Sequence, residues 1–383
     1  MNIIIAGGGI TGLTTAIALN KVGINCKVYE RAPKLTAVGA GIAMSPNAMG
    51  VFDWLGIGDE VRRNGILLDN ATIANRDLSS LKKTDSGFLE KGEDAAVVFI
   101  HRAKLQEVLY SALDPNQVFF GKSYKQHREE DGSVLVEFED GTTTKGSLLL
   151  GADGINSKVR QRLFPNTSLR YSGQTCWRGI ADFQYKEGCT EAWGKEIRFG
   201  FANINKEQIY WFAVAKAPEG EKDKGDKNAI KAKLLDLFGS HFATPVASII
   251  EHTPADKIIR NDITDLNRLK TWSKSRVCLL GDAGHATTPN MGQGGAQGVE
   301  DAYYISNILK RIPDYQKAFE VFDKERRKKV DYIVNSSWTF GRLAHGRFSQ
   351  PLLKMVLKLA PEAMMAKQLK KVYDIPQSFE HLD

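Results

Sequence analysis

The chain has 383 residues, of which 42% are hydrophobic and 25% are charged, and its formal net charge is +7. This length and apolar share allow a large core and more than one domain, and they exclude a disordered composition. The basic balance favours anionic partners, but no basic run is interleaved with aromatic residues, so we expect no nucleic-acid partner. No segment has 18 uninterrupted apolar residues and no signal-peptide pattern precedes the first strand, so we expect a cytoplasmic protein without a membrane span.

Cysteine and histidine usage indicates neither a disulfide scaffold nor a metal centre. Cys26, Cys176, Cys189 and Cys278 form no CxxC pair, and the first and last of them lie in apolar runs typical of buried strands. The seven histidines are scattered without the spacing of metal ligands. We therefore expect reduced thiols and no metal site.

The first thirty residues have the pattern of a strand, a helix and a second strand. Asn2–Ala6 is a short apolar run typical of a buried parallel strand, Thr11–Val22 has helical spacing, and Cys26–Glu30 is again strand-like. The chain therefore begins with a βαβ unit, which favours an α/β fold with a parallel sheet.

A GxGxxG motif, Gly7, Gly9 and Gly12, lies between the first strand and the helix. Gly7 allows the tight turn, Gly9 lets a pyrophosphate approach the backbone, and Gly12 lets the helix pack on the strand. The helix N-terminus attracts phosphate, and Glu30 is placed to accept hydrogen bonds from ribose hydroxyls while repelling a 2′-phosphate. A tight turn with incidental glycines is the alternative. Arg31 is either a contact to the adenosine phosphates or simply exposed.

The next stretch mixes loop, strand and helix patterns. The sequence GAGIAMSPNAM, residues 39–49, is interpreted as a loop that enters a helix through Asn47–Leu55. Alternating residues in ATIAN and AAVVFI predict strands around 70–100, and Arg102–Leu113 has helical spacing.

From residue 118 onward, strand patterns dominate. Two Asp-Gly turns predict hairpins over 118–150, and a second buried strand, Ser147–Gly151, ends at Asp153-Gly154. Aromatic residues and alternation then predict a mostly antiparallel sheet over 173–268.

A second glycine-rich stretch, LLGDAGHATTPNMGQGG, occupies residues 279–295. Arg276–Gly281 is interpreted as a buried parallel strand that delivers Asp282 at its carboxyl end, where the ligands of parallel sheets gather. A carboxylate at this place suits a polyol such as a ribityl chain, which FAD has and NAD lacks.

The glycines of this stretch precede a helix that we expect to begin near Gly298. The N–H groups of Gly292, Gly294 and Gly295 are placed to face negative charge on a cofactor ring, as in reduced FAD. Long helices are then expected over 298–312 and 315–341, followed by an amphipathic helix over 352–373. We expect the methionines of this last helix to serve core packing: Met355, Met364 and Met365.

The motifs GxGxxG, GADG at Gly151–Gly154 and GDAGH at Gly281–His285 occur in this order and at a spacing that is similar to a known family. Over about residues 1–340 the chain resembles group A FAD-dependent aromatic hydroxylases, the para-hydroxybenzoate hydroxylase class. The resemblance implies an α/β fold with a Rossmann-like, GR2-type FAD-binding domain, a mostly antiparallel β-sheet substrate domain and a C-terminal helix. The implied domains are 1–72, 100–172 and 269–345 for FAD binding, 73–99 and 173–268 for substrate, and 346–383 as a C-terminal helical segment.

The resemblance also implies the cofactor site. Asp282 would bind the ribityl and pyrophosphate region, Asp153-Gly154 would serve both FAD and NAD(P)H, and Arg102 would contact FAD. The alternatives are that Asp282 only caps the next segment, that Asp153-Gly154 is only a turn and that Arg102 only starts a helix. For Pro289, the alternative is a residue that ends a loop. The full cofactor-binding set is Gly7, Gly9, Ile10, Thr11, Gly12, Glu30, Arg31, Gly41, Ile42, Arg102, Asp153, Gly154, Asp282, Pro289, Gly292, Gly294 and Gly295.

The implied activity is that of an NAD(P)H-consuming, O₂-dependent monooxygenase. FAD reduced by NADPH or NADH would form a C4a-hydroperoxide, and its distal oxygen would pass to an aromatic or heteroaromatic small molecule, while the protein supplies a dry pocket and orientation. No second GxGxxG is present, which agrees with transient nicotinamide binding. A tetracycline-type drug-inactivating hydroxylase or a ring epoxidase of the same fold is an alternative, as is a non-catalytic FAD-binding redox sensor. Monomer and homodimer are both open.

Two residues stand out as candidates for substrate contact. Arg198 in IRFG and Tyr210 in IYWF lie on consecutive predicted strands, and their spacing resembles the FAD-dependent urate hydroxylase and zeaxanthin epoxidase-like branches. The arginine would hold an anionic ring and the hydroxyl would orient it. A surface arginine and a core tyrosine are the alternative. Tyr210 and His285 are candidates for a general base by location, although we expect His285 to contact the backbone.

Overall fold

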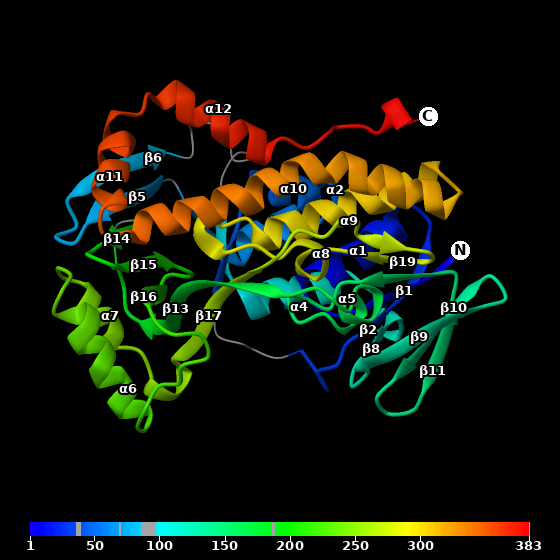
Figure 1. Cartoon of the computed structure of the whole chain (residues 1–383), viewed down its shortest axis with the longest axis horizontal. Helices are drawn as coiled ribbons and strands as arrows, with labels where there is room; N and C mark the ends of the chain where they lie inside the picture. The colour runs from blue at the N-terminus through cyan, green and yellow to red at the C-terminus, as the bar shows by residue number, and fades with distance from the viewer. Residues whose placement is uncertain (36–39, 69, 86–96, 186–187, 383) are drawn as a thin grey trace.

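The structure is a computed structural model that describes residues 1–35, 40–68, 70–85, 97–185 and 188–382. In Figure 1 a parallel sheet with its helices lies on the right and a larger sheet lies on the left. Helix α10 (Tyr315–His345) runs along both of them. The parallel sheet and the larger sheet are thus joined by one long element.

The N-terminal βαβ pattern forms the centre of the parallel sheet, as the sequence predicts. The register aligns Ala6 with both Tyr29 and Gly151, and Gly151 with Leu279, so the carboxyl ends of these strands lie at one edge. The glycines and acidic residues that follow the strands are therefore collected at that edge. The strand order is β18-β19-β12-β1-β2-β8, with bounds Ser273–Lys274, Val277–Leu279, Leu148–Gly151, Asn2–Ala6, Asn25–Tyr29 and Val118–Phe119.

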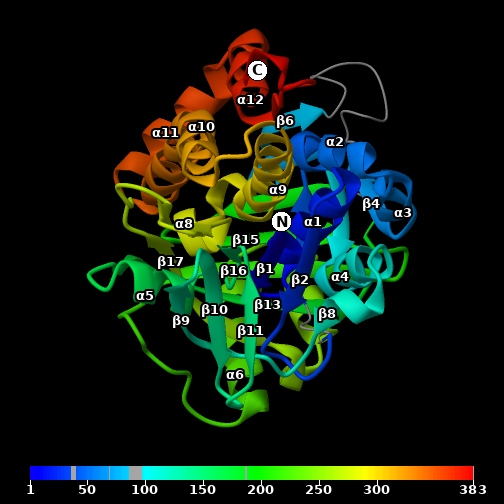
Figure 2. The same ribbon diagram turned by 90° about the vertical axis from the view of Figure 1, so that its right-hand side faces the viewer.

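Helices α1 (Ile10–Lys21) and α9 (Gly294–Arg311) pack together beside this sheet (Figure 2). Their approach is close because a Cβ atom at Gly298 would lie 2.1 Å from Oγ1 of Thr11. Further helices are α2 (Pro46–Leu55), α3 (Gly58–Arg63), α4 (Arg102–Ser111), α5 (Lys158–Leu163) and α8 (Asp282–His285).

Helix α9 begins at Gly294 rather than near the predicted Gly298. Gly292 has a φ of 62°, which is a left-handed value and cannot occur inside a right-handed helix, so the helix begins only after this residue. The N–H groups of Gly294 and Gly295 therefore belong to the first turn of a helix, where N–H groups lack intrahelical partners. The prediction is wrong for the Gly292 N–H, which lies before the helix and donates to the Pro289 carbonyl oxygen at 2.9 Å.

Two small sheets flank the main ones. The predicted hairpins are confirmed as β9 (Tyr124–Glu130), β10 (Ser133–Phe138) and β11 (Thr143–Gly146). The loop predicted over residues 39–49 is wrong for Gly41–Met44, because these residues form strand β3 and pair with β7 (Val97–His101). Strand β7 also pairs with β4 (Gly65–Leu68). Long-range pairing overrides the local glycine and proline signal here. Ala95 and Ala96 of the predicted AAVVFI strand lie outside the described residues.

The larger sheet is mostly antiparallel, as predicted. Its order is β17-β13-β16-β15-β14-β5-β6, with bounds Ile259–Leu266, Leu169–Asp182, Gln208–Lys216, Ile197–Asn203, Cys189–Trp193, Asn70–Asn75 and Ser80–Asp85. One face packs Phe199 and Trp211 against helices α6 (Lys227–Leu234) and α7 (Val246–Glu251). The predicted division of the chain into an FAD-binding domain and a substrate domain stays a prediction.

The C-terminal part differs from the single predicted helix. It forms α11 (Ser349–Leu359) and α12 (Glu362–Tyr373), separated at Ala360 and Pro361, because proline disfavours the helical conformation of the residue before it. The expected core packing of its methionines is wrong for two of them, since Met355 is 52% and Met364 is 58% exposed. The four cysteines are free, as expected, and Cys26 and Cys278 are buried.

Candidate active site

A cleft of about 450 Å³ opens at the carboxyl edge of the parallel sheet. Residues from four segments line it: Gly7–Gly9 after β1, Glu30 after β2, Asp153 and Gly154 after β12, and Asp282 after β19. Arg31 and Arg102 lie along the same cleft. The parallel register therefore brings together groups that the sequence scatters over more than 270 positions.

The glycines of the first motif fit a bound pyrophosphate. A Cβ atom at Gly7 would lie 2.4 Å from the carbonyl oxygen of Ala152, and one at Gly12 would lie 1.9 Å from that of Gly7. A Cβ atom at Gly9 would meet nothing within 4 Å, because Gly9 faces the cleft. Gly7 and Gly12 thus allow close packing, whereas Gly9 leaves open the space in front of the α1 N-terminus, where phosphate is favoured.

The carboxylate of Glu30 is held in one orientation by two backbone N–H groups. Its Oε2 accepts a 2.6 Å hydrogen bond from the Gly8 N–H, and its Oε1 accepts a 2.8 Å bond from the Ala32 N–H. A carboxylate has further lone pairs, so it remains able to accept hydroxyl protons from the cleft. Arg31 is exposed at the rim.

Asp153 has a structural role in addition to the predicted one. Its carboxylate accepts hydrogen bonds from the backbone N–H groups of Lys158 and Val159, at 2.8 and 3.2 Å, and so caps α5. Gly154 follows with a φ of 79° and open space around its Cα atom. The turn that the sequence offered as an alternative is present, and a cofactor contact by these residues stays a prediction.

Arg102 and Asp282 form a charge pair across the deep part of the cleft. Burial raises the pKa of Asp282, and the positive charges of His285, Arg102 and Arg160 oppose this rise. Arg102 is accessible from the cleft, yet it lies deep enough that burial lowers its pKa. A polyol or pyrophosphate placed between them would meet one acceptor and one strong donor.

The GDAGH segment is held by a residue that the sequence analysis missed. Oδ2 of Asp301 accepts hydrogen bonds from the Gly281 N–H at 2.7 Å and from Nε2 of His285 at 2.6 Å. The expectation that His285 contacts the backbone is therefore wrong. Asp301 lies on α9 and also bonds Arg326 of α10, so the turn that carries Asp282 is positioned from behind by two helices. No local pattern singles out Asp301, because Glu300 stands beside it in the same predicted helix.

Strand β3 and the N-terminus of α9 meet near Asp282, since a Cβ atom at Gly294 would lie 3.9 Å from Oδ1 of Asp282. A Cβ atom at Gly295 would lie 2.9 Å from Cδ1 of Ile42, so β3 packs on the first turn of α9. The side chain of Asn47 donates to Oε1 of Gln293 at 3.1 Å, and that of Gln293 donates to Oγ of Ser45 at 2.8 Å. The two segments predicted to flank the cofactor ring are therefore bonded to each other.

Tyr210 lies next to β3, because a Cβ atom at Gly41 would lie 2.7 Å from its ring. The positive charge of Arg178, which the sequence analysis did not single out, acts on the Tyr210 hydroxyl. Burial raises the pKa of Tyr210, which therefore keeps its proton at neutral pH and acts as a donor.

Arg198 is buried, with 2% exposure, and is not a surface residue. Its guanidinium donates to Glu191 at 3.0 Å and to Oδ1 of Asn290 at 2.8 Å. Arg198 pairs with Val214 and not with Tyr210, so the two candidates share a face but lie roughly 13 Å apart along the strand. The twelve-residue spacing on consecutive strands favours a hairpin that brings the two side chains together, and that expectation is wrong. Arg198 ties the sheet to the loop that follows Pro289, and Tyr210 lies near β3.

His345, at the end of α10, gives a testable pH dependence. It is 2% exposed, and burial, assisted by the charge of Arg198, lowers its pKa from 6.5 to about 3. Below pH 6.5 the unfolded chain binds a proton here that the folded chain does not bind until about pH 3. The free energy of unfolding therefore decreases as the pH falls, by up to about 1.4 kcal/mol per pH unit.

Between pH 7 and pH 5 this residue is expected to lower the free energy of unfolding by about 2 kcal/mol. The variant His345→Gln should lose that share of the pH dependence, and His241→Gln, at an exposed position, should keep it. Urea unfolding at both pH values measures the difference. Equal pH dependence in all three proteins would contradict the assignment.

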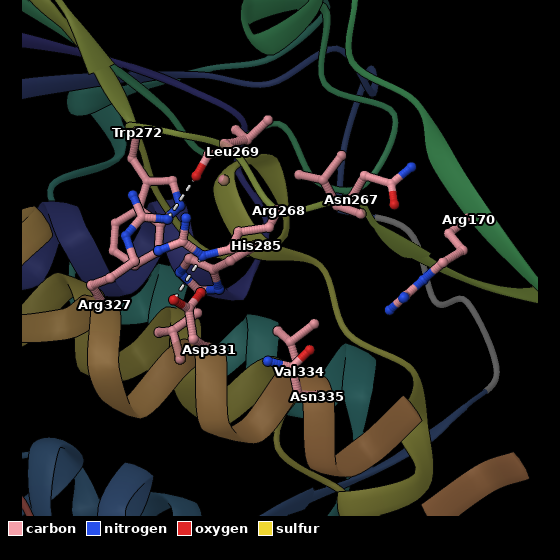
Figure 3. Close-up of a pocket in the computed structure, with 13 residues that line it drawn as sticks. Arg170, Asn267, Arg268, Leu269, Trp272, His285, Arg327, Asp331, Val334 and Asn335 are labelled. Carbon is pink, nitrogen blue, oxygen red and sulfur yellow. Dashed lines mark hydrogen bonds and ion pairs between the residues drawn. The ribbon is translucent and has the colours of Figure 1, made fainter. Parts of the chain in front are cut away.

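A second hollow of about 180 Å³ lies beside α8 (Figure 3). Trp272, His285 and three arginines line it. Each guanidinium is already ion-paired within the described part of the chain: Arg170 with Asp265, Arg268 with Asp331 and Arg327 with Asp323. The hollow is small and its charges are compensated, so the cleft at the strand ends fits a dinucleotide much better.

Comparison with known proteins agrees with this site. Residues 1–334 match a family described as an FAD binding domain. An aurachin C monooxygenase/isomerase from Stigmatella aurantiaca is 38% identical, over 90% of this chain and 89% of the relative. A 2-heptyl-3-hydroxy-4(1H)-quinolone synthase from Pseudomonas aeruginosa is 30% identical, over 97% of this chain and 98% of the relative. The chain therefore belongs to the FAD-binding monooxygenase family, and it is an FAD-dependent monooxygenase of aromatic or heteroaromatic substrates.

The fold comparison leads to the same class. The crystal structure of Klebsiella pneumoniae HpxO complexed with FAD and uric acid matches this chain with a TM-score of 0.90 at 26% identity, over 97% of this chain and 96% of the other. FAD is the cofactor, and NAD(P)H is the usual reductant of the class. The predicted combination of a parallel sheet, a largely antiparallel sheet and C-terminal helices is confirmed.

Proposed function

We propose that this enzyme hydroxylates a fused N-heteroaromatic ring of the 4-quinolone type that carries an apolar side chain. NADH or NADPH supplies two electrons and O₂ supplies both oxygen atoms, one of which enters the new C–OH group while the other leaves as water. Bound FAD supplies the chemistry of O₂ activation. The residues of this chain bind the ring, orient it and exclude water.

The observation that carries the proposal is the composition of the sheet face that points toward β3 and β7. An apolar cluster lies between this face and strands β3, β4 and β7, and besides Tyr210 it consists of Ile66, Leu68, Val97, Phe99, Ala43, Ile180, Cys189, Ala202 and Ile204. Cys189 and Tyr210, on the face itself, are only partly buried. The accessible part of this cluster suits an apolar substituent.

The polar groups on this face suit a ring oxygen. The Tyr210 hydroxyl lies within the electrostatic influence of the Arg178 guanidinium, which donates to Oδ1 of Asn261 at 2.6 Å. Nε of Arg178 is buried and has no hydrogen-bond partner among the described residues. A donor pair of this kind favours the anionic form of a ring carbonyl, which raises the electron density at the adjacent carbon where oxygen is transferred.

The name of one relative supports this substrate class. The 2-heptyl-3-hydroxy-4(1H)-quinolone synthase carries in its name a quinolone ring with an apolar chain. The FAD-dependent urate hydroxylase from Klebsiella pneumoniae is also 30% identical, over 91% of this chain, but urate has no apolar substituent to place against the cluster. The composition of the sheet face therefore favours the quinolone over urate.

The first test is anaerobic stopped-flow reduction of the FAD-loaded protein by NADH and by NADPH. The ligands are 2-methyl- and 2-heptyl-4-quinolone, urate, a phenol and a tetracycline. We expect the heptyl compound to accelerate flavin reduction most, and mass spectrometry after reoxidation should show one added oxygen in the quinolone. If only urate or only tetracycline accelerates flavin reduction, that compound replaces the quinolone as the proposed substrate. Failure of both nicotinamides to reduce the flavin with every ligand would indicate a different reductant or a redox sensor.

Tyr210→Phe should lower kcat/KM for the quinolone by about 10- to 100-fold, because the variant loses one buried hydrogen bond to the ring oxygen. FAD content should be unchanged, and less product should form per NAD(P)H consumed. The matched control is Tyr171→Phe, which loses a hydroxyl bonded to the Ala217 carbonyl on another part of the sheet. Equal kinetics in the two variants would remove Tyr210 from the substrate site.

A further inference from the structure

Helix α11 is attached to the protein through polar side chains. Nε2 of Gln350 donates to the carbonyl oxygen of Gly194 at 2.9 Å. Nζ of Lys354, one turn later, donates to Oδ1 of Asn75 at 3.1 Å and to the carbonyl oxygen of Trp193 at 3.3 Å. Surface helices ordinarily bury their apolar side and expose their polar side. On α11, by contrast, much of the apolar side is exposed.

The outward side chains form a continuous apolar surface, which we name the C-terminal apolar face. It consists of Phe348 (87% exposed), Leu352 (59%), Met355 (52%), Val356 (51%) and Leu359 (71%) on or next to α11, with Met364 (58%) on α12. Most of the exposed large apolar side chains in the described part of the chain are found here. Contiguous apolar surface of this kind marks a docking site.

The surroundings of this face are strongly basic. Residues 342–373 contain seven Lys or Arg side chains and a single carboxylate, Glu362. Six of these cations are exposed, and none of the six has an ion pair within the described residues: Arg342, Arg347, Lys358, Lys367, Lys370 and Lys371. A partner that covers the apolar face must therefore also accommodate a dense positive charge.

Helices α11 and α12 lie at one corner of the molecule, outside α10 and away from the parallel sheet (Figures 1 and 2). Within the described residues, no helix is long and apolar enough to cross a bilayer. A short amphipathic helix with leucines on one side and lysines around it has the composition of helices that lie in the plane of a lipid surface.

We propose that the C-terminal apolar face binds the surface of a membrane that contains anionic lipids. Phe348, Leu352 and Leu359 would enter the boundary between headgroups and acyl chains, and the surrounding lysines would contact lipid phosphates. A second copy of the chain is the weaker candidate, because a two-fold interface would place the same basic residues of both copies together. The attachment of α11 to Trp193 and Gly194 would keep the large sheet close to the bilayer.

The test is flotation of the purified FAD-loaded protein with vesicles. We expect binding to an equimolar mixture of phosphatidylcholine and phosphatidylglycerol to exceed binding to phosphatidylcholine alone by at least about tenfold, and to weaken with salt. The double variant L352Q/L359Q should bind the mixed vesicles about 100-fold more weakly, because two apolar side chains lose their insertion. The matched control L67Q changes an exposed leucine elsewhere, on β4, and should bind like the parent.

A second variant tests the charge independently. K367E/K370E should lose the preference for phosphatidylglycerol while keeping its FAD and its thermal unfolding midpoint. The proposal is overturned if the parent ignores anionic vesicles, or if L352Q/L359Q binds them as the parent does. It is also overturned if light scattering shows a dimer that L352Q/L359Q dissociates while vesicle binding is absent, because a second copy would then be the occupant.

Discussion

Replacing Arg326 by methionine is expected to lower the free energy of unfolding by about 3–5 kcal/mol. The guanidinium is fully buried and donates to Oδ1 of Asp301 at 2.8 Å, to Oε2 of Glu300 at 2.5 Å and to Oε1 of Gln297 at 2.7 Å. Burial raises the pKa of Asp301, but His285 and Arg326 more than offset this and hold it below its usual range. Removing the arginine leaves two buried carboxylates, Glu300 and Asp301, without the cation that pairs with both of them.

Urea denaturation of the FAD-free protein at pH 7 measures this loss. The matched control is Arg268→Met, because Arg268 is 59% exposed at its side chain and pairs with Asp331 on the surface. That variant should change the free energy of unfolding by less than about 1 kcal/mol. If Arg326→Met costs no more than the control, the buried network does not hold α9 and α10 together.

Replacing Gly9 by valine should abolish FAD binding without unfolding the protein. Gly9 has a φ of −75° and a ψ of −175°, which valine adopts without strain, and a Cβ atom there meets nothing within 4 Å. The side chain instead enters the cleft at the N-terminus of α1, where we place the pyrophosphate. We expect FAD affinity to fall at least about 100-fold, with the unfolding free energy of the FAD-free protein within about 0.5 kcal/mol of the parent.

Gly12→Ala is the informative contrast, since a Cβ atom there would lie 1.9 Å from the carbonyl oxygen of Gly7. It should destabilise the FAD-free protein itself, whereas Gly9→Val should not. Fluorescence titration of both apoproteins with FAD, together with urea unfolding, separates the two effects. Tight FAD binding by Gly9→Val would place the pyrophosphate elsewhere.

The sequence was sufficient for those parts of the site that depend on strand order. Gly7, Glu30, Asp153 and Asp282 each follow a parallel strand, and parallel strands end at one edge, so local patterns predicted where the cleft forms. Arg198 and Tyr210 were predicted on the right strands, but the register that separates them depends on the whole hairpin.

Contacts between distant side chains could not be predicted in this way. Asn290, Gln293 and Asp301 act through partners far along the chain, and one sequence contains no signal for such pairs. The C-terminal helices show a related limit. Periodicity identifies an apolar stripe, but it does not say whether the stripe faces the protein, and on α11 much of it faces outward.

The hydrogen bond between Arg198 and Asn290 has a consequence for redesign of this enzyme. Asn290 also donates to the carbonyl oxygen of Ser337 at 3.0 Å, so one amide side chain is shared by the large sheet, the loop after Pro289 and α10. Substitutions of Arg198 would release that amide and shift the segment that follows Pro289. Libraries aimed at new substrates are therefore better directed to Ile180, Cys189 and Ala202, where side-chain volume changes independently of this shared contact.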